Sequence, residues 1–126
     1  MDYSNTETRF HLSRRAERSA NNSKHNVLSE LGTVKKILML NPDYGVPVSG
    51  FGALRKMRVA VPKYNMGKSS GYRLVYRKAV VEEVVFIALL ELYFKGDRAD
   101  LSQSEYQVIL EESEVLLNSL LDVAWG

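Results

Sequence analysis

The chain has 126 residues, of which 45% are hydrophobic and 25% are charged, and its formal net charge is +2. This length and composition fit one globular domain with a hydrophobic core and argue against disorder along most of the chain. There is no cysteine and there are only two histidines, so disulfides and thiolate metal sites are excluded and we expect no metal and no cofactor.

The N-terminal residues lack the basic start and apolar core of a secretory signal. The longest apolar run covers residues 84–90, whereas a membrane-spanning helix needs about 20 apolar residues. We therefore expect a soluble, cytoplasmic protein that does not contact a membrane. Residues 1–7 are expected to be disordered, and the whole chain, residues 1–126, is expected to form one domain.

The small net charge conceals an uneven distribution. Residues 1–81 contain fifteen Lys and Arg against five Asp and Glu, a balance of +10, whereas residues 82–126 contain two against ten, a balance of −8. This division indicates one surface that attracts polyanions and another that attracts basic partners, unless the two sets of charges mingle on the folded surface.

The first predicted elements are a short strand at residues 8–12 and a helix in the segment SRRAERSANN, capped by Ser13. A second helix is predicted to end at Asn41-Pro42. Its buried face is expected to carry residues at steps of three and four, namely Val27, Leu31, Val34 and Leu38. Residues 43–52 contain three glycines and a proline, which is typical of turns.

Three strand candidates follow, at residues 54–61, 71–77 and 83–94, and a long basic loop joins the first two. Ser102 and Glu105 form a capping box, which predicts a C-terminal helix over residues 102–125 with an apolar face and an acidic remainder. This order favours an α+β fold. We expect a small antiparallel sheet with the two N-terminal helices packed on one face and the other face free.

Two of the strand candidates are unusually basic. Alternation places Lys56 and Arg58 on one face of the first, and Arg73 and Arg77 on one face of the second. If these strands pair, Arg73 lies near the other two cations, and a bound phosphate would offset their repulsion. This interpretation requires the cations to converge on one face without a carboxylate for each of them.

Aromatic residues lie between these cations in the sequence, and Tyr93 is expected to be the most exposed of them. Cations and flat rings together suit single-stranded nucleic acid. RNA supplies its own nucleophile, the 2′-hydroxyl, so its cleavage needs only a base, cations that stabilise the phosphate, and an acid. A plain binding site would contain the same residues, so binding and cleavage both stay open.

The segments LRKMR, GKSSGYRLVY and KGDRADLS, with NPDYGVPVSGFG before them, occur in an order that resembles the RelE/ParE superfamily of bacterial toxins, HigB-type RelE branch, over residues 8–110. The resemblance implies a RelE-like fold and cleavage of messenger RNA on the ribosome by 2′-hydroxyl attack, without metal. It also implies a cognate antitoxin, often of the helix-turn-helix type, that holds the toxin inactive.

The resemblance also implies roles for individual residues. The expected catalytic residues are Lys56, Arg58, Arg73 and Lys95. The expected RNA-binding residues are Arg55, Lys63, Lys68, Arg77, Tyr93 and Arg98. RelE has a tyrosine just beyond the last basic segment that stacks on the message; here Tyr106 is displaced into the predicted helix, and Tyr93 is its candidate substitute.

Two other functions remain open: a ParE-like inhibitor of DNA gyrase that is not an enzyme, and an inactive binding protein with the same fold. The basic cluster of Lys56, Arg58 and Arg73 favours the nuclease, because gyrase inhibition does not require a phosphate-cleaving centre. The C-terminal helix is expected to pack on the core, form a homodimer or dock the antitoxin.

Overall fold

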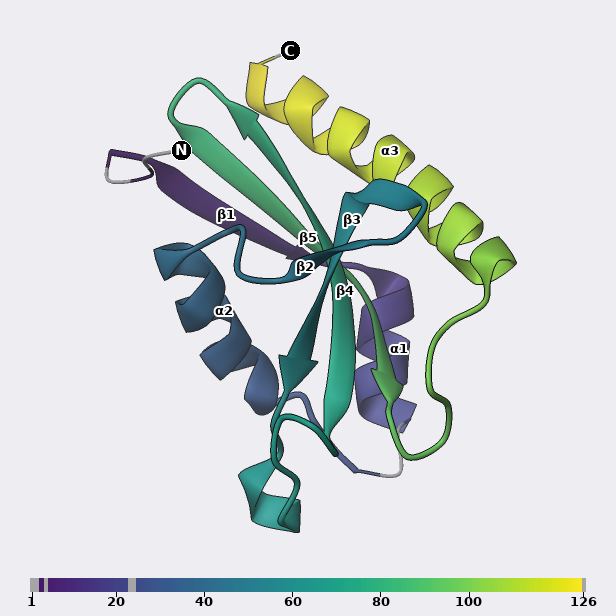
Figure 1. Cartoon of the computed structure of the whole chain (residues 1–126). Coiled ribbons are helices and arrows are strands. Elements are labelled where there is room, and N and C mark those ends of the chain that lie inside the picture. The colour runs from purple at the N-terminus through teal and green to yellow at the C-terminus, as the bar shows by residue number, and fades with distance from the viewer. Residues whose placement is uncertain (1–2, 4, 23–24, 126) are drawn as a thin grey trace.

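The computed structural model describes residues 3, 5–22 and 25–125. It is an α+β fold in which three α-helices surround a five-stranded sheet of order β1-β5-β4-β3-β2. Figure 1 shows the elements, which are β1 (Glu7–Leu12), α1 (Arg14–Asn22), α2 (Glu30–Leu40), β2 (Val46–Val48), β3 (Phe51–Val59), the 3-10 helix η1 (Pro62–Tyr64), β4 (Tyr72–Val81), β5 (Val84–Phe94) and α3 (Gln103–Trp125). In the part of the chain that the structure describes, no helix is both long and apolar enough to cross a membrane.

The sheet is mixed, so the prediction of an antiparallel sheet was wrong for one strand. β2, β3, β4 and β5 pair antiparallel in sequence order, but β1 runs parallel to β5. A tight hairpin would force two strands to be antiparallel. β1 and β5 are instead separated by two helices and three strands, and this long connection allows the parallel pairing. β2 lies within the segment that the sequence predicted only as a turn.

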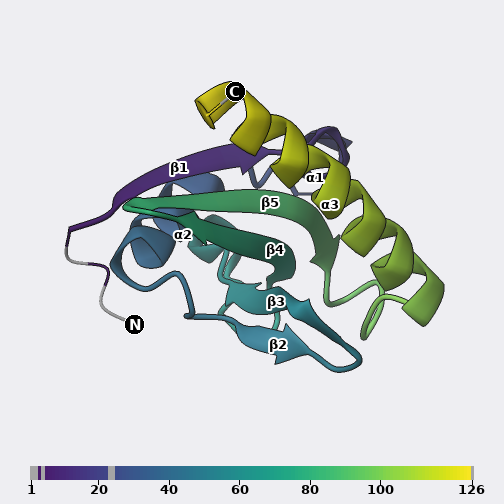
Figure 2. The same cartoon turned by 90° about the horizontal axis from the view of Figure 1, so that it is seen from above.

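α2 covers one face of the sheet (Figures 1 and 2). Its buried residues are Leu31, Val34 and Leu38, as the spacing predicted, and Val27 joins the same core although it precedes the first turn of the helix. They pack with the inward side chains of the central strands, among them Met57, Val59, Tyr72, Leu74 and Tyr76. In both strands these side chains alternate with the predicted basic residues and point to the opposite face, so the predicted alternation is confirmed.

α3 covers the other face, so the expectation that this face remains free was wrong. Tyr106, Ile109 and Leu117 of α3 pack in a second core with outward side chains of the sheet, including Leu54, Val75, Phe86 and Leu90. The predicted capping box is present: the backbone N–H of Glu105 donates to Ser102 Oγ at 3.2 Å, and the N–H of Ser102 donates to Glu105 Oε1 at 3.0 Å. With α2 and α3 in place, the apolar centre of β5 is covered on both sides.

α1 lies beside the edge of β5 where β1 ends. Ser13 caps it, accepting the Ala16 N–H at 3.1 Å, and Ser13 Oγ also donates to the carbonyl of Leu90. Arg15 forms an ion pair with Glu112 of α3. α1 thus shields a strand edge that would otherwise be open.

The structure describes residues 3 and 5–7 of the N-terminal segment, and Tyr3 contacts the turn after α2. The hydroxyl of Tyr3 donates to Asp43 Oδ2 at 2.8 Å, and Glu7 begins β1. Residues 1, 2 and 4 lie outside the described residues.

Candidate nucleic-acid interface

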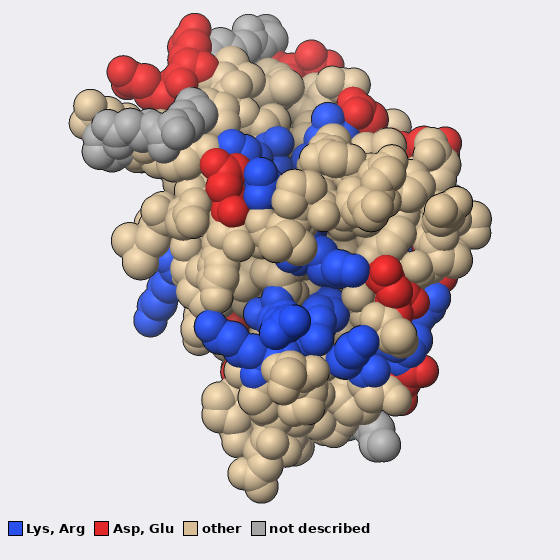
Figure 3. Space-filling model, viewed as in Figure 1, with Lys and Arg blue, Asp and Glu red and all other residues tan. Residues whose placement is uncertain are grey.

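The pairing of β3 with β4 brings the predicted basic residues together. Arg58 stands opposite Arg73, and Arg73 stands opposite Tyr93 of β5. Residues that face each other across neighbouring strands share a face of the sheet. Lys56, two residues before Arg58, shares it too. The cations therefore lie on the α3 side, and Figure 3 shows Lys and Arg side chains gathered in a band across this part of the molecule.

Arg73 is buried in a set of backbone carbonyls. Its residue is only 8% exposed, and its guanidinium donates to the carbonyl oxygens of Lys68 at 3.1 Å, Ser69 at 3.3 Å and Tyr72 at 3.3 Å. It forms no ion pair with a carboxylate among residues 3, 5–22 and 25–125. Arg73 therefore holds the loop between β3 and β4 in place.

Arg58 and Lys68 are the cations of the site that pair with no carboxylate among the described residues. Arg58 is exposed and forms no ion pair or side-chain hydrogen bond with any described residue. Lys68 is exposed and donates to the hydroxyl of Tyr44 at 3.0 Å. Together with Lys56 they border a surface pocket of about 340 Å³, the Tyr44 pocket, which is lined by Tyr44, Gly45, Val46, Lys56, Met57, Arg58 and Lys68.

Lys56 belongs to a hydrogen-bonded group centred on Asp100, in the loop before α3. Its Nζ lies 3.1 Å from Asp100 Oδ1 and 3.4 Å from the hydroxyl of Tyr106. The same carboxylate oxygen accepts hydrogen bonds from the hydroxyls of Tyr93 and Tyr106 and from the N–H of Leu101. Partial burial opposes ionisation of Asp100, but the hydrogen bonds from Tyr106 and Lys56 outweigh it and hold its pKa below the usual range.

The two tyrosines of this group stay protonated. Burial is the main reason that the pKa of Tyr93 is raised, and burial with the hydrogen bond to Asp100 raises the pKa of Tyr106. Tyr93 is only 6% exposed, so the prediction that it is the most exposed aromatic was wrong. Its ring packs in the core beneath α3, on the face of the sheet that the sequence analysis expected to be free.

Three more predicted residues contact α3 or the loop before it. Arg77 pairs with Glu114 of α3 at 2.6 Å and donates to Ser113 Oγ at 3.1 Å. Arg98 pairs through both terminal nitrogens with Glu105. Lys95 donates to the carbonyl of Ala99 at 3.3 Å. The acidic C-terminal part of the chain thus neutralises part of the basic face.

Arg55 and Lys63 are not brought to this site. Arg55 stands opposite Tyr76, whose ring is in the α2-side core, and its Nη1 donates to the carbonyl of Gly45 at 2.6 Å. Lys63 lies in η1, where its Nζ contacts Glu30 at 3.5 Å. Neither of them lines the Tyr44 pocket.

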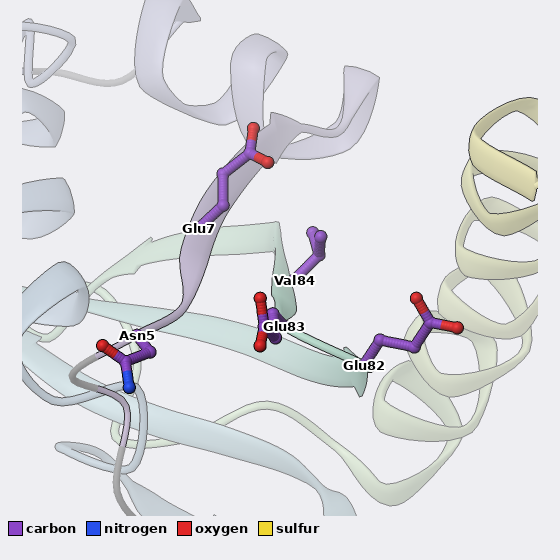
Figure 4. A pocket seen from close by; sticks show the side chains of 5 residues that line it. All are labelled: Asn5, Glu7, Glu82, Glu83 and Val84. Atoms are coloured by element: carbon purple, nitrogen blue, oxygen red, sulfur yellow. The ribbon is translucent and has the colours of Figure 1, made fainter.

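A second pocket of about 430 Å³ lies at the start of β1 and the β4–β5 turn, lined by Asn5, Glu7, Glu82, Glu83 and Val84. Figure 4 shows that its carboxylates point in different directions, and Glu7 pairs with Arg9 at 3.0 Å. No group of three or more potential metal ligands occurs among the residues that the structure describes. This pocket offers no evident chemistry.

Sequence reasoning missed two residues of the site, Asp100 and Tyr44. Asp100 stands in the quoted segment KGDRADLS, but its contact with Lys56 depends on how the loop before α3 folds back over β3. Tyr44 lies in a turn-forming segment, and the only signal for it in the sequence was an aromatic residue between Asp43 and Gly45.

A comparison with models of known protein families found none that matches this chain.

Proposed function

We propose that this chain is a RelE-type toxin, a ribosome-dependent endoribonuclease that cuts messenger RNA by attack of the 2′-hydroxyl and is held inactive by a cognate antitoxin. The observation that carries the proposal is the exposed guanidinium of Arg58, which pairs with no carboxylate in the described part of the chain and lies directly opposite Arg73, beside Lys56 and Lys68. A guanidinium binds a phosphate through two parallel hydrogen bonds, and a cluster of cations stabilises the charge that gathers there during cleavage.

The contacts suggest a division of roles. Arg58 and Lys68 have no carboxylate partner among the described residues, so they hold the phosphate. Lys56 is fixed by Asp100 and Tyr106. It donates a proton to the departing 5′ oxygen, while the proton of the attacking 2′-hydroxyl passes to solvent water. Arg73, which the resemblance implied to be catalytic, acts by fixing the loop that carries Lys68.

The experiment is controlled expression of the chain in bacteria, followed by mapping of RNA 5′ ends. We expect growth arrest with cuts at defined codon positions in translated messages. Arg58→Ala should lower the rate of cutting by about 10²-fold or more, since it removes a donor to the charged transition state. Arg14→Ala is the matched control, because Arg14 is also exposed and lies on α1, at the opposite edge of the sheet.

The other functions predict different results. Growth arrest with DNA damage and intact messages would support the gyrase inhibitor and overturn the nuclease proposal. An absence of growth arrest, with the protein folded and expressed, would support the inactive binding protein. Equal cutting by the Arg58→Ala and Arg14→Ala variants would show that the catalytic centre lies elsewhere.

A further inference from the structure

The turn that carries Tyr44 is held in one conformation from beneath. The N–H of Gly45 donates to the hydroxyl of Tyr76 at 2.8 Å, and that hydroxyl donates to the carbonyl of Pro42 at 2.9 Å. Arg55 donates to the carbonyls of Asp43 and Gly45. A side chain on Gly45 would come within 2.8 Å of the carbonyl of Lys56, so the turn lies directly against β3. Tyr44 is therefore presented by a preorganised backbone.

The ring of Tyr44 is accessible at the rim of the pocket. The residue is 38% exposed, and its neighbour Val46 is 63% exposed. Lys68 Nζ lies 3.0 Å from the Tyr44 hydroxyl and 5.7 Å from the ring centroid. These two distances place the ammonium beyond the hydroxyl end of the ring, so it does not cover either ring face. β2 pairs with β3 only as far as Lys56, which leaves the pocket open beyond that point.

We propose that the Tyr44 pocket binds one nucleobase of single-stranded RNA, stacked on the ring of Tyr44, while Arg58 and Lys68 bind the adjoining phosphate. This inference rests on the proposed function and assigns it a base-binding subsite. Stacking on an exposed tyrosine beside cations is how proteins bind single strands with little sequence preference. At about 340 Å³ the pocket is at the small end of ligand pockets, which suits a single base.

The test measures binding of a short 2′-O-methyl RNA that contains 2-aminopurine. This RNA lacks the attacking hydroxyl and is not cut, and 2-aminopurine fluorescence is quenched when the base stacks. A base-free oligonucleotide of the same length and charge serves as the comparison ligand. Tyr44→Ala should weaken binding of the RNA by about 5- to 150-fold and remove the quenching, because one stacked base is lost. Binding of the base-free ligand should be unchanged.

Two variants control the result. Tyr64→Ala is the matched control for Tyr44→Ala, because Tyr64 is also exposed, at 45%, and Lys63 Nζ lies 5.5 Å from the centroid of its ring. Tyr64 differs in that it lies in η1, outside the pocket. It should bind RNA as the unaltered chain does. Tyr44→Phe keeps a ring for stacking and should retain most of the affinity and the quenching.

Equal loss of RNA affinity in the Tyr44→Ala and Tyr64→Ala variants would overturn the subsite. Equal affinity of the unaltered chain for RNA and for the base-free ligand would also overturn the subsite. The cations would then form a general binding site for polyanions, which could include an acidic peptide. Neither of these two outcomes contradicts the nuclease proposal if messages are cut in cells. Base-dependent binding without any cutting in cells would overturn the nuclease proposal alone.

Discussion

Removal of one buried hydroxyl should loosen the turn that carries Tyr44. The side chain of Tyr76 is fully buried, and its hydroxyl accepts a hydrogen bond from the N–H of Gly45 and donates one to the carbonyl of Pro42. Burial is the main reason that the pKa of Tyr76 is raised, so the hydroxyl remains a donor at neutral pH. Tyr76→Phe removes both hydrogen bonds and leaves the ring in place.

The expected cost follows from the two groups left without a partner. Pro42 and Gly45 are both buried, so water does not readily replace the missing hydroxyl. An unsatisfied buried donor or acceptor costs about 1–3 kcal/mol. For the pair we expect Tyr76→Phe to lower the free energy of unfolding by about 2–4 kcal/mol. For a domain of this size the melting temperature should fall by roughly 8–15 °C.

The assay is urea unfolding followed by circular dichroism, with Tyr72→Phe as the matched control. Tyr72 is a second buried tyrosine of β4, but its hydroxyl has only one described side-chain partner, His25 Nδ1 at 3.3 Å. Its loss should cost under about 1 kcal/mol. If Tyr76→Phe destabilises the chain no more than Tyr72→Phe does, the hydroxyl does not hold the turn, and the argument that Tyr44 is preorganised fails.

Three further results are expected. Ser102→Ala should lower the free energy of unfolding by about 1 kcal/mol in chemical denaturation, because α3 loses its N-cap; no loss would mean that the capping box is not formed in solution. Arg98 and the backbone of Ser102 lower the pKa of Glu105 to about 2. Its contribution to stability should therefore be present above about pH 4.5 and lost as the pH falls towards 2, and circular dichroism should show a smaller acid-induced change in Glu105→Gln. Gly71→Ala should destabilise the chain by about 2–3 kcal/mol in thermal melts, because the added carbon would lie 2.2 Å from a backbone oxygen of β3. Gly67→Ala, which meets nothing within 4 Å, should leave the melting temperature unchanged.

Local patterns in the sequence predicted most of the secondary structure and the faces of the basic strands. Alternation in a strand is a consequence of backbone geometry, so Lys56 and Arg58 had to share a face once β3 formed. Ser13 and Ser102 marked the starts of two helices for a similarly local reason, because a cap bonds a backbone group only three residues away. These features require no knowledge of the rest of the fold.

The accessibility and charge of the site were decided by contacts between distant parts of the chain. The sequence showed that α3 has an apolar side, but only the packed structure shows that α3 covers the basic face of the sheet and buries Tyr93. Lys56 and Asp100 are 44 residues apart in the sequence, yet they form an ion pair. Arg77 is likewise neutralised by Glu114.

The sequence by itself thus determined which residues are basic, which strands carry them and which face they share, because these properties depend on composition and backbone periodicity. The tertiary structure alone decided that Arg58 and Lys68 pair with no carboxylate among the described residues, that Arg73 donates to backbone carbonyls, and that Tyr44 lies beside Arg58 and Lys68. The physical reason is that a charge or a ring is available for binding only when no distant part of the chain has already covered it, and no local pattern records those contacts.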